Sequence, residues 1–155
     1  MKHKSFWQAL VLALVLGLLL LPGLPAIAED LLMARVPMTF PEAMLKLQNT
    51  LKKHNHTLSR VQRVDIGLTS KGYKTDKYRI VFYGQADEIR QLADEYPQVI
   101  PYLPHKIAIF AEEEETMLVA VNPEMLFMTE DPKLRAIMKK WHEDLQVILK
   151  DMRED

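Results

Sequence analysis

Apolar residues recur every three or four positions in two segments of the chain, and this spacing predicts two amphipathic helices. The first stripe runs from Phe40 to Leu51. Thr39 and Glu42 have the spacing of a capping box, so the helix is expected to begin at Thr39. Asn55 follows the stripe and suits the left-handed backbone that ends many helices.

The second stripe lies near the C-terminus. Asp131 is a good N-cap residue, and Pro132 suits the first helical position. The apolar residues that follow share one helical face: Leu134, Ile137, Met138, Trp141, Leu145, Ile148, Leu149 and Met152. Trp141 stands in the middle of this face, so we expect it to be buried against a sheet.

Shorter apolar or alternating runs predict five strands, over residues 31–36, 56–68, 78–83, 105–111 and 116–121. A short amphipathic helix over 89–96 separates the third strand from the fourth. Prolines at 97, 101 and 104 are expected to forbid regular structure until His105. The last two strands flank an acidic turn and form a hairpin.

This element order predicts an α+β fold. The order is β-α-β4-α, with the short helix inserted between the third and fourth strands. Such an order gives an antiparallel or mixed sheet with helices on one face. The predicted division of the chain is a signal peptide over 1–28, an α+β domain over 29–127, and an amphipathic helix over 128–155 packed on that domain.

The first 28 residues have the three parts of a secretory signal peptide. Lys2 and Lys4 precede an apolar run from Ala9 to Leu21, which fits the ~7–15 residues of a signal core and falls short of the ~20 that span a bilayer. Small residues in 26–28 predict cleavage after Ala28 and a soluble periplasmic product, with no stable membrane insertion. An uncleaved anchor is the alternative.

Charge and cysteine content exclude several classes of protein. The net charge is −1, and loss of the two signal-peptide lysines would make it about −3, so there is no basic surface for nucleic acid. The chain has no cysteine. This excludes disulfides, a thiolate nucleophile, covalent c-type haem and a lipid attached at a cysteine.

Three stretches carry a resemblance to a known family. They are Val64-Asp65, the strand of residues 78–83 running into Gly84, and Tyr102-Leu103-Pro104 followed by a strand over 106–110. In this order and spacing, the segment from about Leu31 to Phe127 resembles the Domain of Unknown Function 302 family. The resemblance implies a β-α-β4-α domain of TATA-binding-protein-like architecture, commonly a dimer, and no established activity.

Four positions depart from the family pattern. Ile66 stands where the family often has histidine after Asp65, and Gln85-Ala86 replace Asn-Pro. His105 takes a position after Leu-Pro that is usually apolar in the family. Any site that depends on the missing histidine is therefore in doubt in this chain.

The proline-stiffened stretch 96–105 is the first place to expect a ligand site. Its rigid backbone would present Tyr96, Tyr102 and His105 at little entropic cost, and a neutral imidazole beside phenols can orient a polar group. Asp65 is included as a candidate base. The competing interpretation is a stiff crossover whose tyrosines cover the edge of the sheet.

Histidines and methionines suggest an alternative metal site. His54 and His56 are two residues apart across a helix end and could converge on a metal with a third ligand from elsewhere. A metal or haem carrier could instead use His105 with methionine or His142. Otherwise, His54 complements the helix dipole and His56 opens an exposed strand. Thioethers with imidazole would suit copper(I). Outside the signal peptide the methionines are Met33, Met38, Met44, Met117, Met125, Met128, Met138 and Met152, most of them on predicted core faces.

Four successive carboxylates, Glu112 to Glu115, form the acidic turn of the predicted hairpin. Their oxygens could hold calcium weakly. A hairpin tip of like charges is normally just solvated, however, and it discourages pairing with other chains. No Asp-x-Asp-x-Asp-Gly loop supports a calcium site.

Motifs of known enzyme classes are missing from the sequence. Ser59 and Ser70, the serines outside the signal peptide, lack a Gly-x-Ser-x-Gly setting, and there is no phosphate loop, dinucleotide fingerprint or His-Glu-x-x-His. The sequence therefore predicts a non-catalytic periplasmic accessory protein without a cofactor, a homodimer that binds a small ligand or an envelope protein. The alternatives are a copper or haem carrier, and a small hydrolase or isomerase using Asp65 and His105.

Overall fold

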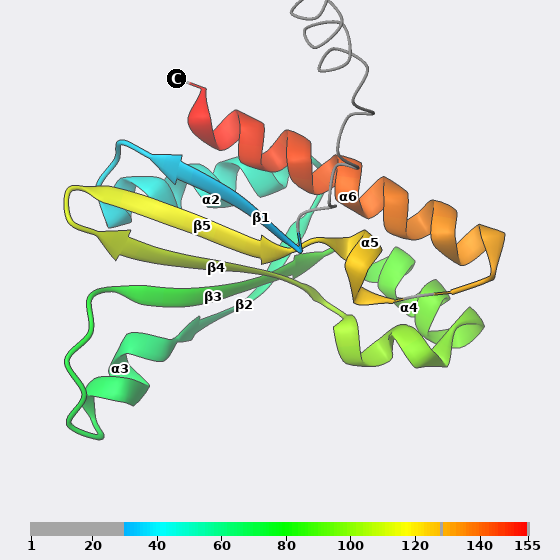
Figure 1. Ribbon diagram of the computed structural model, residues 1–155, viewed down its shortest axis with the longest axis horizontal. Helices are drawn as coiled ribbons and strands as arrows, with labels where there is room; N and C mark the ends of the chain where they lie inside the picture. The colour runs from blue at the N-terminus through cyan, green and yellow to red at the C-terminus, as the bar shows by residue number, and fades with distance from the viewer. Residues whose placement is uncertain (1–29, 128, 155) are drawn as a thin grey trace, which may run out of the picture.

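Five strands form one antiparallel sheet in the order β1-β5-β4-β3-β2 (Figure 1). The computed structural model describes residues 30–127 and 129–154, so the predicted signal peptide lies outside the described residues. The strands are β1 Leu31–Val36, β2 Thr57–Arg63, β3 Tyr78–Gly84, β4 His105–Glu112 and β5 Glu115–Val121. All four pairings between neighbouring strands are antiparallel.

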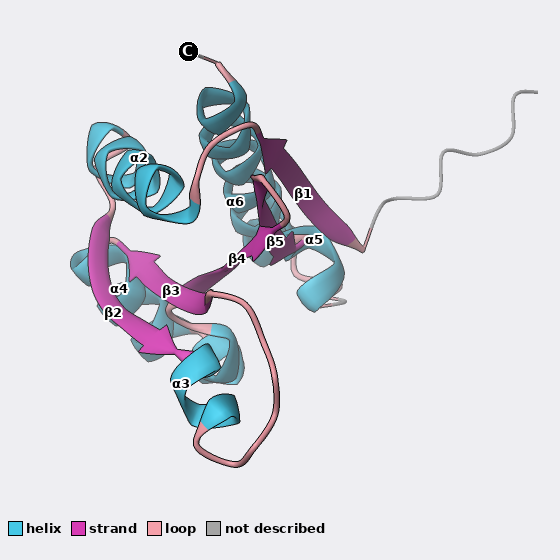
Figure 2. Ribbon diagram, turned by 90° about the vertical axis from the view of Figure 1, so that its left-hand side faces the viewer, coloured by secondary structure: helices cyan, strands magenta, loops and turns pink. Residues whose placement is uncertain are grey.

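Helices fill the connections, and the two longest of them cover one face of this sheet (Figure 2). They are α2 Phe40–Lys53, α3 Val64–Thr69, α4 Ala86–Glu95, α5 Pro123–Leu126 and α6 Pro132–Arg153, with a 3₁₀ helix η1 over Pro97–Tyr102. The predicted α+β class, the β-α-β4-α order and the helix between the third and fourth strands are confirmed, and the sheet is antiparallel. No helix in the described ranges has the length and hydrophobicity needed to cross a membrane.

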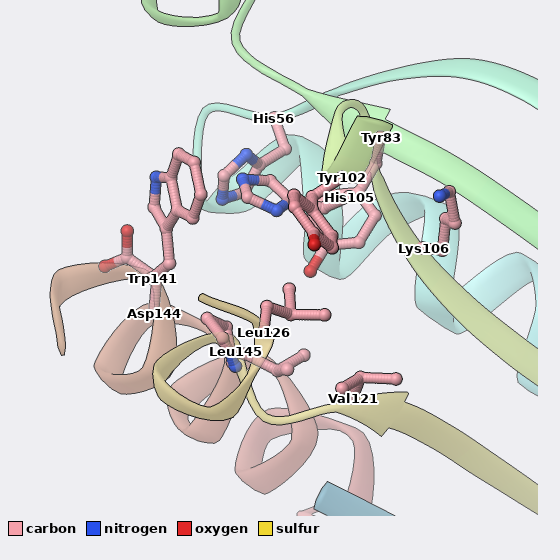
Figure 3. A pocket seen from close by; sticks show the side chains of 11 residues that line it. His56, Tyr83, Tyr102, His105, Lys106, Val121, Leu126, Trp141, Asp144 and Leu145 are labelled. Carbon is pink, nitrogen blue, oxygen red and sulfur yellow. The ribbon is translucent and has the colours of Figure 1, made fainter. Parts of the chain in front are cut away.

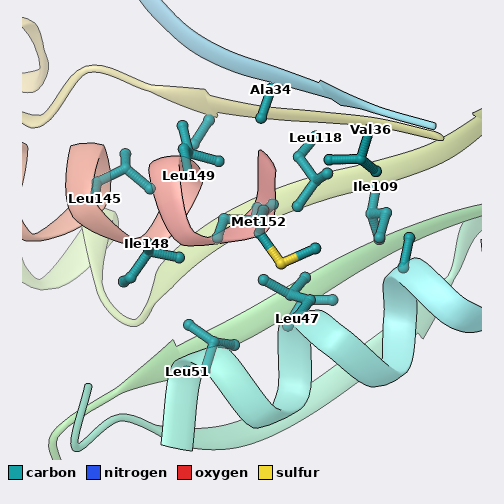
Figure 4. Packing of buried hydrophobic residues seen from close by; sticks show 14 of the residues in the cluster. Ala34, Val36, Leu47, Leu51, Ile109, Leu118, Leu145, Ile148, Leu149 and Met152 are labelled. Atoms are coloured by element: carbon teal, nitrogen blue, oxygen red, sulfur yellow. The ribbon is translucent and has the colours of Figure 1, made fainter. Parts of the chain in front are cut away.

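The main core lies between the sheet and the helices α2 and α6 (Figure 4). In β1 exposed and buried residues alternate strictly, so the strand presents every second side chain to the core. The fully buried residues Leu47 and Leu51 of α2 meet Ile148 and Met152 of α6 there. The two apolar stripes of the sequence therefore face each other above one side of the sheet.

Local capping fixes both ends of α2 and the beginning of α6 where the sequence predicts them. The backbone N–H of Thr39 donates to the Glu42 carboxylate at 3.0 Å, completing the capping box of α2. Asn55 has a φ of 60°, the left-handed stop expected after this helix. At the start of α6, Asp131 Oδ1 accepts from the backbone N–H groups of Lys133 at 2.8 Å and Leu134 at 3.1 Å.

The predicted strand over 56–68 is too long. Strand β2 ends at Arg63, and residues 64–69 form the short helix α3. Side chains bond to the backbone within this turn, since Thr69 Oγ1 donates to the Asp65 carbonyl at 2.9 Å and Ser70 Oγ donates to the Gly67 carbonyl at 2.9 Å. Such local bonds favour a helical turn over continued strand pairing.

The expectation that prolines forbid regular structure over 97–104 is wrong for most of this stretch. Residues 97–102 form η1, in which Pro97 takes a first-turn position and Pro101 stands near the end. A first-turn proline loses no intrahelical bond, because the N–H that it lacks would be unpaired there. Strand β4 begins at His105, as predicted.

A second, smaller core lies beside the sheet, between α4, η1 and the first half of α6. It contains Leu92, Val99, Leu134, Met138 and Trp141. Trp141 is only 4% exposed, so its predicted burial is confirmed. Its neighbours are this cluster and the first residue of β4 rather than the middle of the sheet.

Candidate functional site

Strands β4 and β5 are paired near their turn and separate at the far end of their hairpin. Their register runs from Glu112 opposite Glu115 to Ala108 opposite Val119, whereas β4 stays paired with β3 as far as His105 opposite Tyr83. The beginning of β4 therefore follows β3, and the end of β5 leads away into α5.

A cavity of about 110 Å³ lies at this separation (Figure 3). Its walls come from seven segments: the residue before β2, the end of β3, the end of β5, the start of β4, the end of η1, α5 and the middle of α6. The lining residues are His56, Tyr83, Tyr102, His105, Lys106, Val121, Pro123, Leu126, Trp141, Asp144 and Leu145.

Four aromatic rings form a continuous row along one wall. The ring centroids of His56 and Tyr83 are 5.2 Å apart in an edge-to-face arrangement, and those of Tyr83 and His105 are 5.5 Å apart. His105 then meets Trp141 edge to face at 4.4 Å. These separations are in the range of favourable aromatic pairing, so each ring limits the movement of the next.

His56 lines the cavity, and its buried Nδ1 atom has no hydrogen-bond partner among the described residues. The residue is only 8% exposed, which corrects the expectation that His56 opens an exposed strand. The left-handed turn at Asn55 causes this burial, because the His56 N–H donates to the Leu51 carbonyl at 2.9 Å and folds the chain back over the end of α2. An unsatisfied buried polar atom is costly and calls for an explanation.

Both imidazoles of the cavity are neutral at physiological pH. Burial lowers the pKa of His105 to about 4, although the carboxylates of Glu88 and Asp144 act in the opposite direction. Burial also lowers the pKa of His56, and it raises the pKa of the Tyr83 phenol. Each neutral imidazole can offer one hydrogen-bond donor and one acceptor.

Charged residues hold the α6 side of the cavity in place. Lys140 pairs with Glu88 at 3.2 Å and with Asp144 at 3.5 Å. Glu88 also accepts from the indole Nε1 of Trp141 at 3.3 Å. The polar edge of Trp141 is therefore bonded toward α4, and its ring remains available as part of the apolar wall.

The structure brings together two of the four predicted ligand residues. Tyr102 and His105 line the cavity. Tyr96 lies in the second core, with the Lys133 ammonium 5.9 Å from its ring centroid. Asp65 lies near the opposite end of β3, away from Tyr83.

The Asp65 carboxylate forms an ion pair with Arg79 in that region, and the bond lowers the pKa of the carboxyl. The Arg79 guanidinium also lies 5.5 Å from the ring centroid of Phe40. These contacts give Asp65 a structural partner, and they place it apart from His105, with which it could otherwise have formed an acid and base pair.

The four histidines of the metal hypothesis divide into three places. His56 and His105 line the cavity. His54 Nε2 lies 2.8 Å from Asp151 at the C-terminal end of α6, and His142 Nδ1 lies 2.8 Å from Asn122 Oδ1. Within residues 30–127 and 129–154, no group of three or more histidine, aspartate and glutamate side chains has the arrangement of a metal site.

Sequence reasoning missed Tyr83 and Trp141 as cavity residues and interpreted both as core. A signal existed for Tyr83, which is the last inward position of β3 before Gly84 and therefore stands at a sheet end. Nothing in the sequence places His56 or Trp141 beside it, because their meeting depends on how α6 crosses the separated strands.

Comparisons with known proteins agree with the observed fold. A family model described as "Domain of unknown function DUF302" matches residues 33–152, which include most of α6. The crystal structure of an uncharacterized conserved DUF302 protein from Bacillus stearothermophilus superposes with a TM-score of 0.75 at 23% identity. It covers 81% of this chain and 100% of that protein. The search of curated proteins finds no match.

Proposed function

The chain belongs to the DUF302 family, and from the geometry of its cavity we propose that it is an exported, non-catalytic protein that binds a small neutral molecule as a homodimer. One observation carries the proposal. His56 lines the cavity and its buried Nδ1 has no partner among the described residues, so a turn of the imidazole toward a bound molecule would satisfy this atom.

The volume of the cavity limits the size of the ligand. Drug-sized molecules occupy roughly 300–1,000 Å³, and an engineered cavity of about 150 Å³ holds benzene. At about 110 Å³ the cavity suits a molecule of a few heavy atoms or several ordered waters. This size favours a small ligand over the haem alternative.

The chemistry of the walls indicates the polarity of the ligand. Two neutral imidazoles and the Tyr102 phenol offer hydrogen bonds, and the rings of Tyr83 and Trp141 offer apolar contact. The two charged residues of the lining, Lys106 and Asp144, have opposite signs, so the cavity has no net charge that would favour an ion. A neutral molecule with one polar group and a small apolar body matches this combination. The separation of Asp65 from His105 supports the non-catalytic part of the proposal.

The signal-peptide pattern of residues 1–28 supports export to the periplasm as a soluble protein. Cleavage after Ala28 would leave Glu29 as the first residue, directly before the described fold. The exported protein is therefore expected to begin at Glu29, and the mass of the purified chain can test this.

Native mass spectrometry of untagged protein released from the periplasm tests these statements together. We expect a dimer of chains that begin at Glu29, with an added mass on each chain. His56→Phe should remove the added mass, because phenylalanine fills the same space without a polar atom to satisfy. Tyr96→Phe is the matched control, since Tyr96 lies outside the cavity.

Three results would contradict parts of the proposal. An adduct that persists in His56→Phe would place the ligand elsewhere. An intact Met1 would replace the exported soluble protein by an anchored one. Turnover of a metabolite that is lost in His105→Phe would replace the binding protein by an enzyme.

A copper carrier is the second candidate, because His56 and His105 both face one cavity. No described methionine lines this cavity, so among the described residues copper(I) would find two imidazoles and no thioether. Copper at one ion per chain in the purified protein, lost in His105→Phe and retained in His142→Gln, would favour this carrier over the small organic ligand.

A further inference from the structure

Within the described residues, no helix covers the middle of the second face of the sheet, which we call the open face. It consists of the strand residues that alternate with the core residues, and none of them is buried except Gly84, which Ile89 of α4 covers at the end of β3. One row across its middle is formed by Ile80, Ala108, Val119 and Met33, which lie opposite one another in the strand register. The open face is therefore apolar at its centre.

The next row along the strands is also largely apolar. Tyr78, Phe110 and Met117 are opposite one another, and the rings of Tyr78 and Phe110 meet edge to face with centroids 6.0 Å apart. Met33 is 49% exposed and Val121 48% exposed on the same face. A contiguous apolar surface of this kind marks an interaction site.

The two ends of the open face carry opposite charge. At one end, Arg60 and Lys106 flank Phe82 in a single row. At the other end, Glu112 lies opposite Glu115. Arg35 pairs with both carboxylates, at 2.6 Å to Glu112 and 2.9 Å to Glu115, so this end keeps a net negative charge.

We infer that the open face is the interface between two copies of this chain, related by a two-fold axis that runs across the strands. Such an axis reverses the strand direction, so Lys106 of one copy faces Glu112 of the other, and this contact occurs twice. The two apolar rows then cover each other, as in an aligned pair of sheets. The inference rests on the homodimer of the proposed function and identifies its surface.

Charge decides between the two ways of placing two identical faces together. An axis parallel to the strands would bring Lys106 against the basic end of the second copy, and like charges in an interface are strongly unfavourable. An unrelated partner would need its own matching gradient of charge. A second copy already has that gradient, and this complementarity selects it as the occupant.

Charge reversal tests the arrangement in solution, with the mature protein measured by sedimentation velocity. We expect wild type to be dimeric and Lys106→Glu and Glu112→Lys each to weaken the dimer about tenfold or more. A mixture of the two variants should form a heterodimer, because each chain then supplies the charge that the other needs at both contacts. Lys52→Glu on the exposed side of α2 is the control and should remain dimeric.

The outcomes separate this inference from the proposal on which it rests. A monomeric wild type at the highest soluble concentration overturns both the dimer and the interface. A dimer that both reversals leave unchanged retains the homodimer and overturns the open face as its surface. Monomeric variants that stay apart on mixing overturn the two-fold arrangement. Native tryptophan emission in each variant verifies that it is folded.

Discussion

The imidazole of His105 and the indole of Trp141 meet edge to face with their ring centroids 4.4 Å apart. His105 begins β4, and Trp141 stands in the middle of α6. This pair therefore joins the sheet to the C-terminal helix at the cavity, and the state of either ring can be measured through the other.

Trp141 is expected to emit as a buried indole in a chain expressed from Glu29 onward, which lacks Trp7 and so contains one tryptophan. It is 4% exposed, so its emission should be shifted to the blue and weakly quenched by acrylamide. Fluorescence of the folded protein, with the urea-unfolded chain as reference, checks this. Emission equal to that of the unfolded chain would mean that α6 does not pack as described.

Stability is expected to fall between pH 6.5 and pH 4. Burial lowers the pKa of His105 from 6.5 to about 4, so the unfolded chain takes up this proton first as the pH falls. The contribution of the neutral imidazole is complete above pH 6.5 and is lost by pH 4, a decrease of up to about 3 kcal/mol in the free energy of unfolding. Urea titrations at several pH values measure it.

His105→Gln should flatten this part of the pH profile, leaving the smaller contribution of His56, whose pKa is also lowered. Asp151 acts in a different window. Its hydrogen bonds from Lys53 and His54 lower its pKa from 3.8 to about 2, so its contribution is lost only below pH 3.8. An unchanged profile in His105→Gln would contradict the burial of a neutral imidazole.

Two leucines of α2 provide a matched pair for the main core. Leu47 is fully buried between α2, α6 and the sheet, whereas Leu45 is 61% exposed. Leu47→Ala is expected to lower the free energy of unfolding by about 2–5 kcal/mol through lost burial and a cavity. Leu45→Ala should change it by less than about 0.5 kcal/mol. Equal effects in urea unfolding would contradict the assignment of the buried face.

Asp131 is expected to stabilise the start of α6. Its carboxylate accepts from two backbone N–H groups of the first turn, and Asp131→Ala leaves both without this partner. We expect a loss of about 1 kcal/mol, visible as a lower midpoint of thermal unfolding. Asp131→Asn retains an oxygen acceptor and should recover most of the loss. A cap without effect would show that the beginning of α6 frays.

Strong periodicity made most of the fold predictable from the sequence. The stripes of α2 and α6 and the alternation of β1 depend on residues such as Leu47, Leu145 and Val36, whose burial the local pattern already requires. The region of 56–68 was harder, because its alternation is imperfect and the helical turn of α3 depends on side-chain bonds to the backbone and on a distant ion pair with Arg79.

The candidate site was predictable only in part, for a related reason. Tyr102 and His105 stand out locally, since prolines lie close to both in the sequence. His105 also stands out because it takes a position that is usually apolar in the family that the chain resembles. His56 and Trp141 join them through the turn at Asn55 and the packing of α6, which are contacts between segments far apart in the chain. Local patterns carry no information about such meetings.

The separation of β4 and β5 also bears on how ligand preference could change during evolution. The space between the parting strands is closed by α5, a helix of four residues, through Pro123 and Leu126. Substitutions in α5 would change the shape of the cavity and leave the hydrogen bonds between the strands in place. The hydrogen-bonded sheet would thus stay constant while the size of the cavity changed.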